Sequence, residues 1–244
     1  MMLSAGDLVL VGLVVVAAAF LQTVSGFGFA LFVVPIFGLF IDVKVGVVIS
    51  TLAGLASSTH QAVKDRQGIN RPLAGRLIVA SLAGMPVGLL VIIVVSSDTL
   101  QVVIGLLVIL SAAALARGVA VRLVSPVADW IAGFVSGVLA TSASTNGPPL
   151  VVLLQARSLP AHVFRPTVNA VFVVGGAVSL ALYTLAGRLG WREISAALIA
   201  FPGLAIGIAA GRWARDFVSS EGFRVLVLAL LAITGVTSTL AGLT

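Results

Sequence analysis

Apolar residues fall into ten runs along the chain, separated by short polar or glycine-rich interruptions. The runs cover residues 8–24, 29–41, 45–63, 73–96, 99–116, 127–141, 148–156, 166–186, 194–211 and 223–243. A spanning helix needs about 20 mostly apolar residues at 1.5 Å each, so the runs at 29–41 and 148–156 are too short to cross a membrane as ordinary helices. The pattern predicts an all-α polytopic membrane protein with two broken segments.

Composition supports this fold class. Of the 244 residues, 60% are hydrophobic and only 9% are charged, whereas soluble domains carry about 25% charged residues. The bilayer is therefore the expected solvent. The N-terminus has no basic stretch before the first apolar run, which favours a membrane helix over a cleavable signal peptide.

Several functional classes find no support in the sequence. The 14 Lys and Arg are scattered between apolar runs and form no basic face, so we do not expect nucleic-acid binding. There is no cysteine, no pair of carboxylates inside an apolar run, and no GxSxG, HExxH or P-loop motif. We expect neither an enzyme nor a protein with a metal or another cofactor.

The two halves of the chain carry the same features in the same order. Ser25-Gly26 recurs as Ser136-Gly137, and Gly84-x-x-x-Gly88 recurs as Gly207-x-x-x-Gly211. We therefore predict one transmembrane domain of two repeats, each a broken hairpin followed by three helices. Repeat 1 is 1–122, with hairpin 8–41 and helices 45–63, 73–96 and 99–116; repeat 2 is 123–244, with hairpin 127–156 and helices 166–186, 194–211 and 223–243.

Loop charge predicts the orientation. If each broken segment returns to its starting side, one side holds eleven Lys and Arg, in the loops around 64–76, 117–122, 157–165 and 212–224, and the other holds three. The positive-inside rule then places the basic side in the cytoplasm and both termini, with the loop at 187–193, outside. Three crossings per repeat is an odd number, so the repeats would be inverted.

Inverted repeats with broken helices are typical of transporters, whose binding sites lie where the helices are interrupted. In the second hairpin, Asn146-Gly147 followed by two prolines predicts a helix start, with Asn as N-cap. The unpaired N–H groups of such a helix favour an anion. Ser142, Ser144 and Thr145 precede it and offer hydroxyl groups; a plain turn with its cap is the alternative.

The first hairpin supplies a matching set of candidates. They are Gln22, Thr23, Ser25, Gly26 and Gly28, although hydrogen bonds between helices would explain the polar ones equally well. Aligning the helices after each hairpin brings Thr51 opposite Asn169, 118 positions on, and both join the predicted binding site. His60 and Gln61 are candidates for a proton-transfer or gating role, with a solvated histidine at the interface as the simpler interpretation.

Three stretches carry a resemblance to a known family. QTVSGFGFALFVVP, GFVSGVLATSASTNGPPLVVLL and LPAHVFRPTVNAVF resemble the sulfite exporter TauE/SafE family of permeases, over nearly the whole chain. Many members have three or four glycines after the Ser-Gly pair, where this chain has Gly28-Phe29-Ala30, so it resembles a variant branch. The resemblance implies a bacterial or archaeal cytoplasmic-membrane transporter of small organosulfur compounds or sulfur oxyanions.

The resulting hypothesis is a secondary transporter that moves a small anion, sulfonate-like or sulfite-like, by alternating access. The expected partners are this anion, the lipid bilayer, a coupling ion (H⁺ or Na⁺) and other copies of the chain in a homo-oligomer. An anion channel and a membrane scaffold subunit without transport activity are the alternatives.

Overall fold

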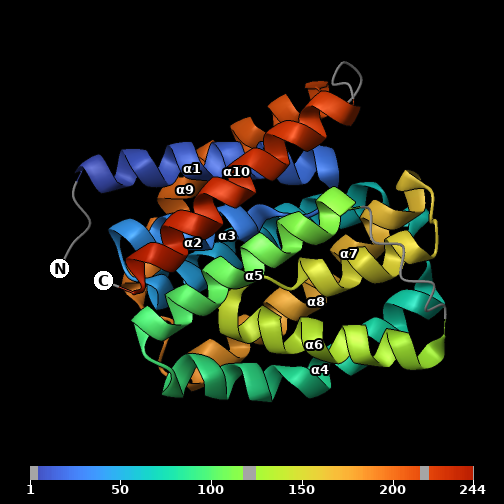
Figure 1. Ribbon diagram of the computed structural model, residues 1–244, viewed down its shortest axis with the longest axis horizontal. Helices are drawn as coiled ribbons and strands as arrows, with labels where there is room; N and C mark the ends of the chain where they lie inside the picture. Colours follow the sequence, from blue (N-terminus) through green and yellow to red (C-terminus); the bar gives the residue numbers. More distant parts are fainter. Residues whose placement is uncertain (1–4, 118–124, 215–219, 244) are drawn as a thin grey trace.

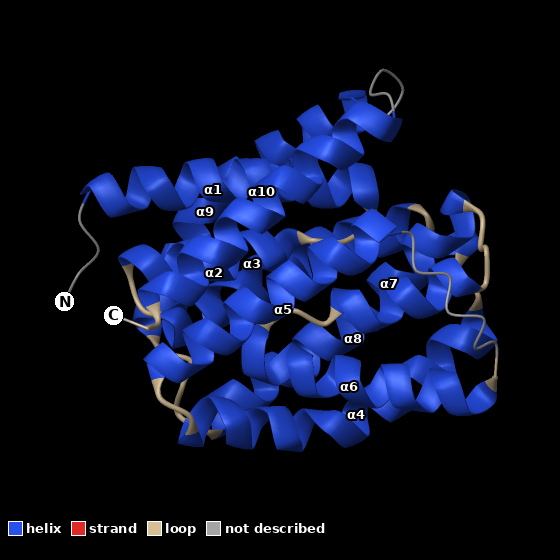
Figure 2. Ribbon diagram, viewed as in Figure 1, coloured by secondary structure: helices blue, strands red, loops and turns tan. Residues whose placement is uncertain are grey.

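Every predicted apolar run forms a helix in the computed structural model, which describes residues 5–117, 125–214 and 220–243. The described part contains no strand (Figure 2). The elements are α1 (Ala5–Ser25), α2 (Phe29–Phe40), α3 (Val43–Lys64), the 3-10 turn η1 (Arg66–Gly68), α4 (Arg71–Val94), α5 (Ser97–Arg117), α6 (Pro126–Ala143), α7 (Gly147–Ala156), α8 (Ala161–Leu185), α9 (Trp191–Ala214) and α10 (Ser220–Ala241). The all-α fold class is confirmed.

Helix starts follow local capping chemistry. The side chains of Asp42, Asn70 and Ser125 accept hydrogen bonds from first-turn N–H groups of α3, α4 and α6. Helix α8 begins at Ala161, five residues before the predicted start. Pro166 lies in the sixth position of α8 and is tolerated there, because it removes only the hydrogen bond to the His162 carbonyl.

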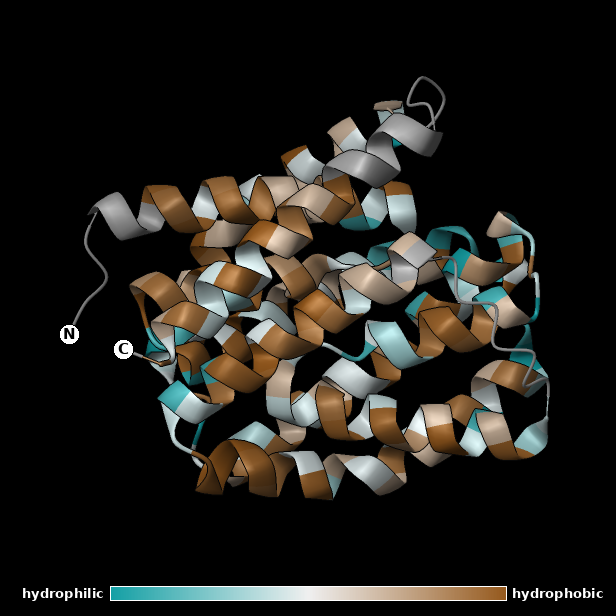
Figure 3. Ribbon diagram, viewed as in Figure 1, coloured by the Kyte–Doolittle hydropathy of each residue, from teal (hydrophilic) through white to brown (hydrophobic). Residues whose placement is uncertain are grey.

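Within the described residues, five helices are long and apolar enough to cross a membrane. They are Arg71–Val94, Ser97–Ala114, Pro126–Ala143, Ala161–Leu185 and Trp191–Ala214. Their outward surfaces carry large apolar side chains such as Leu90, Phe134 and Ile206. In Figure 3, the outer helices are coloured mostly brown, the colour of hydrophobic residues. Such a surface suits lipid and not water. The chain is thus a multi-pass membrane protein.

Helices from opposite halves pack closely against each other. Helix α4 lies on α6, and α1 lies on α9 (Figure 1). A β-carbon on Gly88 would overlap the Val138 carbonyl of α6, and one on Gly207 would overlap the Val16 carbonyl of α1. The repeated GxxxG motifs therefore serve close helix packing, as small residues do in membranes.

The structure corrects one of the correspondences between the halves. Gly26 lies in the break after α1, whereas Gly137 lies inside α6, where its β-carbon would overlap the Ser81 carbonyl of α4. The Ser-Gly pairs therefore occupy different places. The exchange of packing partners, α1 with α9 and α6 with α4, is the arrangement that two inverted repeats would produce, and the inversion itself stays a prediction.

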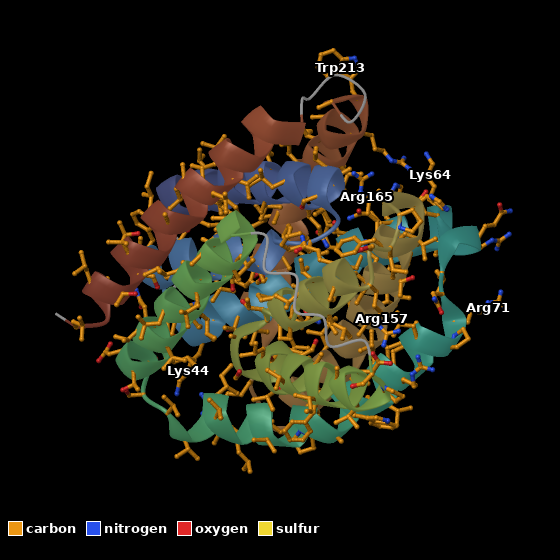
Figure 4. The ribbon with its side chains drawn as sticks, turned by 45° about the vertical axis from the view of Figure 1, so that its right-hand side comes forward. Lys44, Lys64, Arg71, Arg157, Arg165 and Trp213 are labelled. Carbon is orange, nitrogen blue, oxygen red and sulfur yellow. The ribbon has the colours of Figure 1, made fainter. Side chains whose placement is uncertain are left out.

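Charged side chains gather at one end of the molecule. In Figure 4, Lys64, Arg71, Arg157 and Arg165 lie at this end and Lys44 lies at the other. Asp129, fully buried in the first turn of α6, forms ion pairs here with Arg76 of α4, at 2.9 Å, and with Arg157 after α7. We call this three-residue group the Asp129 clasp; it joins both ends of the second hairpin to α4.

Candidate functional site

The break between α1 and α2 is built by two glycines with positive φ. Gly26 has φ +93° and Gly28 has φ +100°, a region that only glycine enters readily. The Gly26 N–H still donates to the Gln22 carbonyl at 2.7 Å, and the Ser25 hydroxyl lies 2.7 Å from the carbonyls of Leu21 and Phe27. The chain thus turns sharply, and α2 starts directly at the break.

The break between α6 and α7 is held by side chains of the same segment. Ser144, with φ +53°, ends α6, and its N–H donates to the Ala140 carbonyl at 3.1 Å. The Thr145 hydroxyl donates to the Ala143 carbonyl at 2.9 Å, and the Ser136 hydroxyl donates to the Asn146 carbonyl at 2.9 Å. These bonds fix the backbone where α7 begins.

The prediction that the Asn146 side chain caps α7 is wrong. Asn146 stands at the N-cap position, but its side chain makes no capping hydrogen bond. A capping side chain accepts from the second or third N–H of the helix, and those positions are Pro148 and Pro149, which have none. The amide nitrogen lies instead beside Gly175 of α8, 3.4 Å from where a β-carbon would stand.

The two breaks meet at a small cavity of about 50 Å³, large enough for one or a few water molecules. We call it the central cavity. The backbone of both breaks reaches it, at Gly28 and Gly147, and α3 and α8 close its sides. Its polar lining residues are all uncharged: Gln22, Ser50, Thr51, Ser58, Ser144, Thr145, Asn146 and Ser179.

Several of these polar groups are buried without a protein partner. The side-chain oxygens of Gln22, Ser50 and Ser179 have none, although each residue is at most 2% exposed. Leaving a buried polar group unsatisfied costs about 1–3 kcal/mol. Such groups therefore favour a polar occupant of the central cavity, either water or a bound molecule.

Other polar groups form hydrogen bonds between the helices that line the cavity. The Thr51 hydroxyl lies 2.8 Å from the Val47 carbonyl and 3.0 Å from the Ser144 hydroxyl, which links α3 to the second break. The Gln22 amide nitrogen donates to the Ser58 hydroxyl at 3.1 Å, which links α1 to α3. The Thr51 bond thus couples the second break directly to a helix of the first half.

The two helices that start at the cavity offer different numbers of N–H donors. The first N–H groups of a helix have no partner within it, and in α2 these belong to Phe29, Ala30 and Leu31, which all line the cavity. In α7 the prolines leave only Gly147 with a first-turn N–H at the cavity. The start of α2 is therefore the better place for a negatively charged oxygen.

The structure brings seven of the predicted site residues together at the cavity: Gln22, Gly28, Thr51, Ser144, Thr145, Asn146 and Gly147. The others lie elsewhere. Thr23 contacts Gly211 of α9, and Ser142 donates to the Val138 carbonyl within α6. Ser25, Gly26 and Asn169 belong to the first break and its support and do not line the cavity.

His60 and Gln61 are also away from the cavity. His60 is exposed near the end of α3, and the Gln61 amide donates to Ser57 of its own helix at 3.3 Å. Neither residue lines the central cavity.

Eleven cavity-lining residues escaped the sequence prediction, among them three serines and the first residues of α2. Ser50 and Ser58 share one face of α3 with Gly54, four residues from each, and this helical spacing of small residues was a usable signal. Ser179 has the analogous position relative to Gly176 on α8. Phe29, Ala30 and Leu31 are apolar first-turn residues of α2, and their residue types do not reveal that this helix starts at the cavity.

Comparison with known proteins now places the chain. No curated protein and no solved structure is significantly similar to it. The sequence profile of one family, described as sulfite exporter TauE/SafE, matches residues 11–238, which include both breaks and all residues of the central cavity. The chain therefore belongs to the sulfite exporter TauE/SafE family of membrane permeases.

Proposed function

We propose that the protein is a secondary transporter that carries a small anion, sulfite-like or sulfonate-like, through the central cavity. The observation that carries this proposal is the lining of the central cavity, which combines the first-turn residues Phe29, Ala30 and Leu31 of α2 with the unpartnered buried hydroxyls of Ser50 and Ser179. Hydroxyl groups and backbone N–H groups donate hydrogen bonds to an oxyanion without a fixed counter-charge. Family membership supports the permease activity and the sulfite-like chemistry.

The proposed mechanism is rocking of one half of the molecule against the other. Each hairpin packs against a helix of the opposite half, α1 on α9 and α6 on α4, and both breaks contribute to one cavity. A movement between inverted repeats would open that cavity to one side and then to the other. A gradient of H⁺ or Na⁺ or of the anion itself would drive transport.

Counterflow in proteoliposomes tests the proposal. Vesicles loaded with unlabelled sulfite should transiently accumulate radiolabelled sulfite above equilibrium, because a carrier exchanges the two through one site. Unlabelled methanesulfonate inside should also support accumulation, whereas acetate inside should support less. Imposed H⁺ and Na⁺ gradients would then identify the coupling ion.

The alternatives give different results in the same vesicles. A channel would equilibrate the label without any overshoot, and a scaffold subunit would move none. Either outcome, with every anion of the panel, would contradict a carrier function.

The proposed orientation has both termini outside and the basic end, with η1, in the cytoplasm. Because the chain has no cysteine of its own, single cysteines report sidedness cleanly. Gln67 and Arg188 are both exposed, at the basic end and in the loop before α9. An impermeant maleimide should label Arg188→Cys in intact cells, and should label Gln67→Cys only after the membrane is opened. Labelling of Gln67→Cys in intact cells would reverse the orientation.

A further inference from the structure

A second and larger cavity, of about 690 Å³, opens at the basic end of the molecule. It lies between the end of α3, the turn η1 and the start of α8. The polar and charged groups that line it come from Lys64, Asp65, Gln67, His162 and Arg165. We call it the vestibule. Unlike the central cavity, it is lined by cationic side chains.

Arg165 is the most buried of these cations, and its guanidinium forms no ion pair with any carboxylate that the structure describes. The ion pairs within 4.0 Å among the described residues are those of Asp129 with Arg76 and Arg157. Asp65 acts on Arg165 only from a longer distance. A half-buried guanidinium without a paired carboxylate is a strong site for an oxyanion, because its planar array of N–H groups can hold two oxygens at once.

The stem of Arg165 connects the vestibule to the first break. Its Cγ lies 2.8 Å from the place of a β-carbon on Gly26, so only glycine fits there. Asn169, one turn further along α8, donates to the Arg165 carbonyl at 2.9 Å and lies 3.5 Å from the Gly26 carbonyl. Arg165 thus sits directly on the backbone that leads, two residues later, to Gly28 in the central cavity.

We propose that the vestibule is a second anion-binding site, in which Arg165, assisted by Lys64, holds the small oxyanion next to the first break. This inference rests on the proposed function, since it concerns the same substrate. The central cavity has no charged lining residue, so the vestibule supplies the electrostatic attraction that concentrates the anion at its entrance. Arg165 should therefore set the apparent affinity at low substrate concentration more than the maximal rate.

Chemical modification of Arg165→Cys separates charge from packing. The purified variant, which contains one cysteine, is alkylated with bromoethylamine, iodoacetamide or iodoacetate, which install a cationic, a neutral or an anionic group through a stable thioether. Lys44→Cys at the opposite end, treated identically, is the control. Sulfite counterflow is then measured over a range of sulfite concentrations.

We expect the neutral product of Arg165→Cys to raise the half-saturating sulfite concentration at least tenfold, as follows from losing about 1.5–3 kcal/mol of charged hydrogen bonding. The cationic product should recover most of the affinity, and the anionic product should be the weakest. Maximal rates should change little, and the Lys44→Cys products should match the parent. Equal affinities for the cationic and neutral products would show that Arg165 acts through packing alone and would overturn the proposal.

Titration calorimetry of the detergent-solubilised protein keeps the vestibule distinguishable from the transport function. The parent should bind two sulfite ions per chain, and the neutral product of Arg165→Cys should bind one. Two calorimetric sites in that product would refute the vestibular site, even if the parent shows sulfite counterflow. Loss of one calorimetric site, in a protein whose parent shows no counterflow, would refute only the transport function. If Arg165→Cys does not fold, the same tests are made on Lys64→Cys, whose side chain is exposed. We expect its alkylated products to show the same order of sulfite affinities with smaller differences. Equal affinities for its cationic and neutral products would overturn the proposal.

Discussion

Asn146→Asp is expected to lower the rate of sulfite counterflow about a thousandfold at low sulfite concentration. Two like charges about 4 Å apart repel by about 4 kcal/mol at an effective dielectric constant of about 20, and about 1.4 kcal/mol corresponds to a factor of ten. The variant should fold normally because the Asn146 side chain makes no capping hydrogen bond that the change could disrupt. Initial counterflow rates, with thermal unfolding measured in parallel, check both statements.

Two comparisons isolate the charge. Asn146→Ala removes a donor without adding a charge and should cost about tenfold, the effect of one hydrogen bond to an anion. Gln155→Glu makes the same amide-to-carboxylate change at the exposed far end of α7 and should transport like the parent. If Asn146→Asp transports sulfite as fast as the parent, the anion does not pass the central cavity at this point.

Gly88→Ala should destabilise the protein strongly, to the point of losing folded material at moderate temperature. The added β-carbon would overlap the Val138 carbonyl and the Thr141 hydroxyl of α6. The Thr141 hydroxyl already donates to the Met85 carbonyl of α4 at 2.7 Å, so neither helix can give way without breaking this contact. Overpacking of this kind costs about 1–3 kcal/mol and sometimes more, which a shift in the melting temperature of the detergent-solubilised protein would report.

Gly75→Ala provides the matched control in the same helix. No atom lies within 4 Å of its added β-carbon, and alanine favours a helix by about 0.8–1.0 kcal/mol over glycine. This variant should therefore be as stable as the parent or slightly more stable. If Gly88→Ala and Gly75→Ala melt alike, α4 and α6 do not pack as closely as described.

Hydropathy alone was enough to place the ten α-helices of the described residues, since in a membrane protein the bilayer imposes long apolar runs and the interruptions stand out. The paired GxxxG motifs likewise indicated close packing, because few residues allow two backbones to approach. What they did not reveal was the partner: Gly88 packs on α6 and Gly207 on α1, and this exchange between halves depends on the three-dimensional fold.

The central cavity was harder to predict than the helices. The residues at the breaks were identifiable because glycine, serine and asparagine interrupt an apolar pattern, as at Gly28 and Asn146. The interpretation of Asn146 as a cap failed because residue preference was considered without the two prolines that follow it. The backbone of α2 escaped notice because N–H groups are available at every helix start and only the fold shows which ones face a cavity.

If the two halves are inverted repeats, the Asp129 clasp makes them mechanically unequal. Shifting Asp129 and Arg157 back by 118 positions gives Val11 and Leu39, and shifting Arg76 forward by 123 gives Ile199, so the three equivalent positions would all be apolar. A joint held by directional ionic bonds resists sliding, whereas one made of aliphatic side chains can slide and repack with little loss of contact. The second hairpin would then stay fixed to α4 during transport, and the movement would occur where α1 slides against α9.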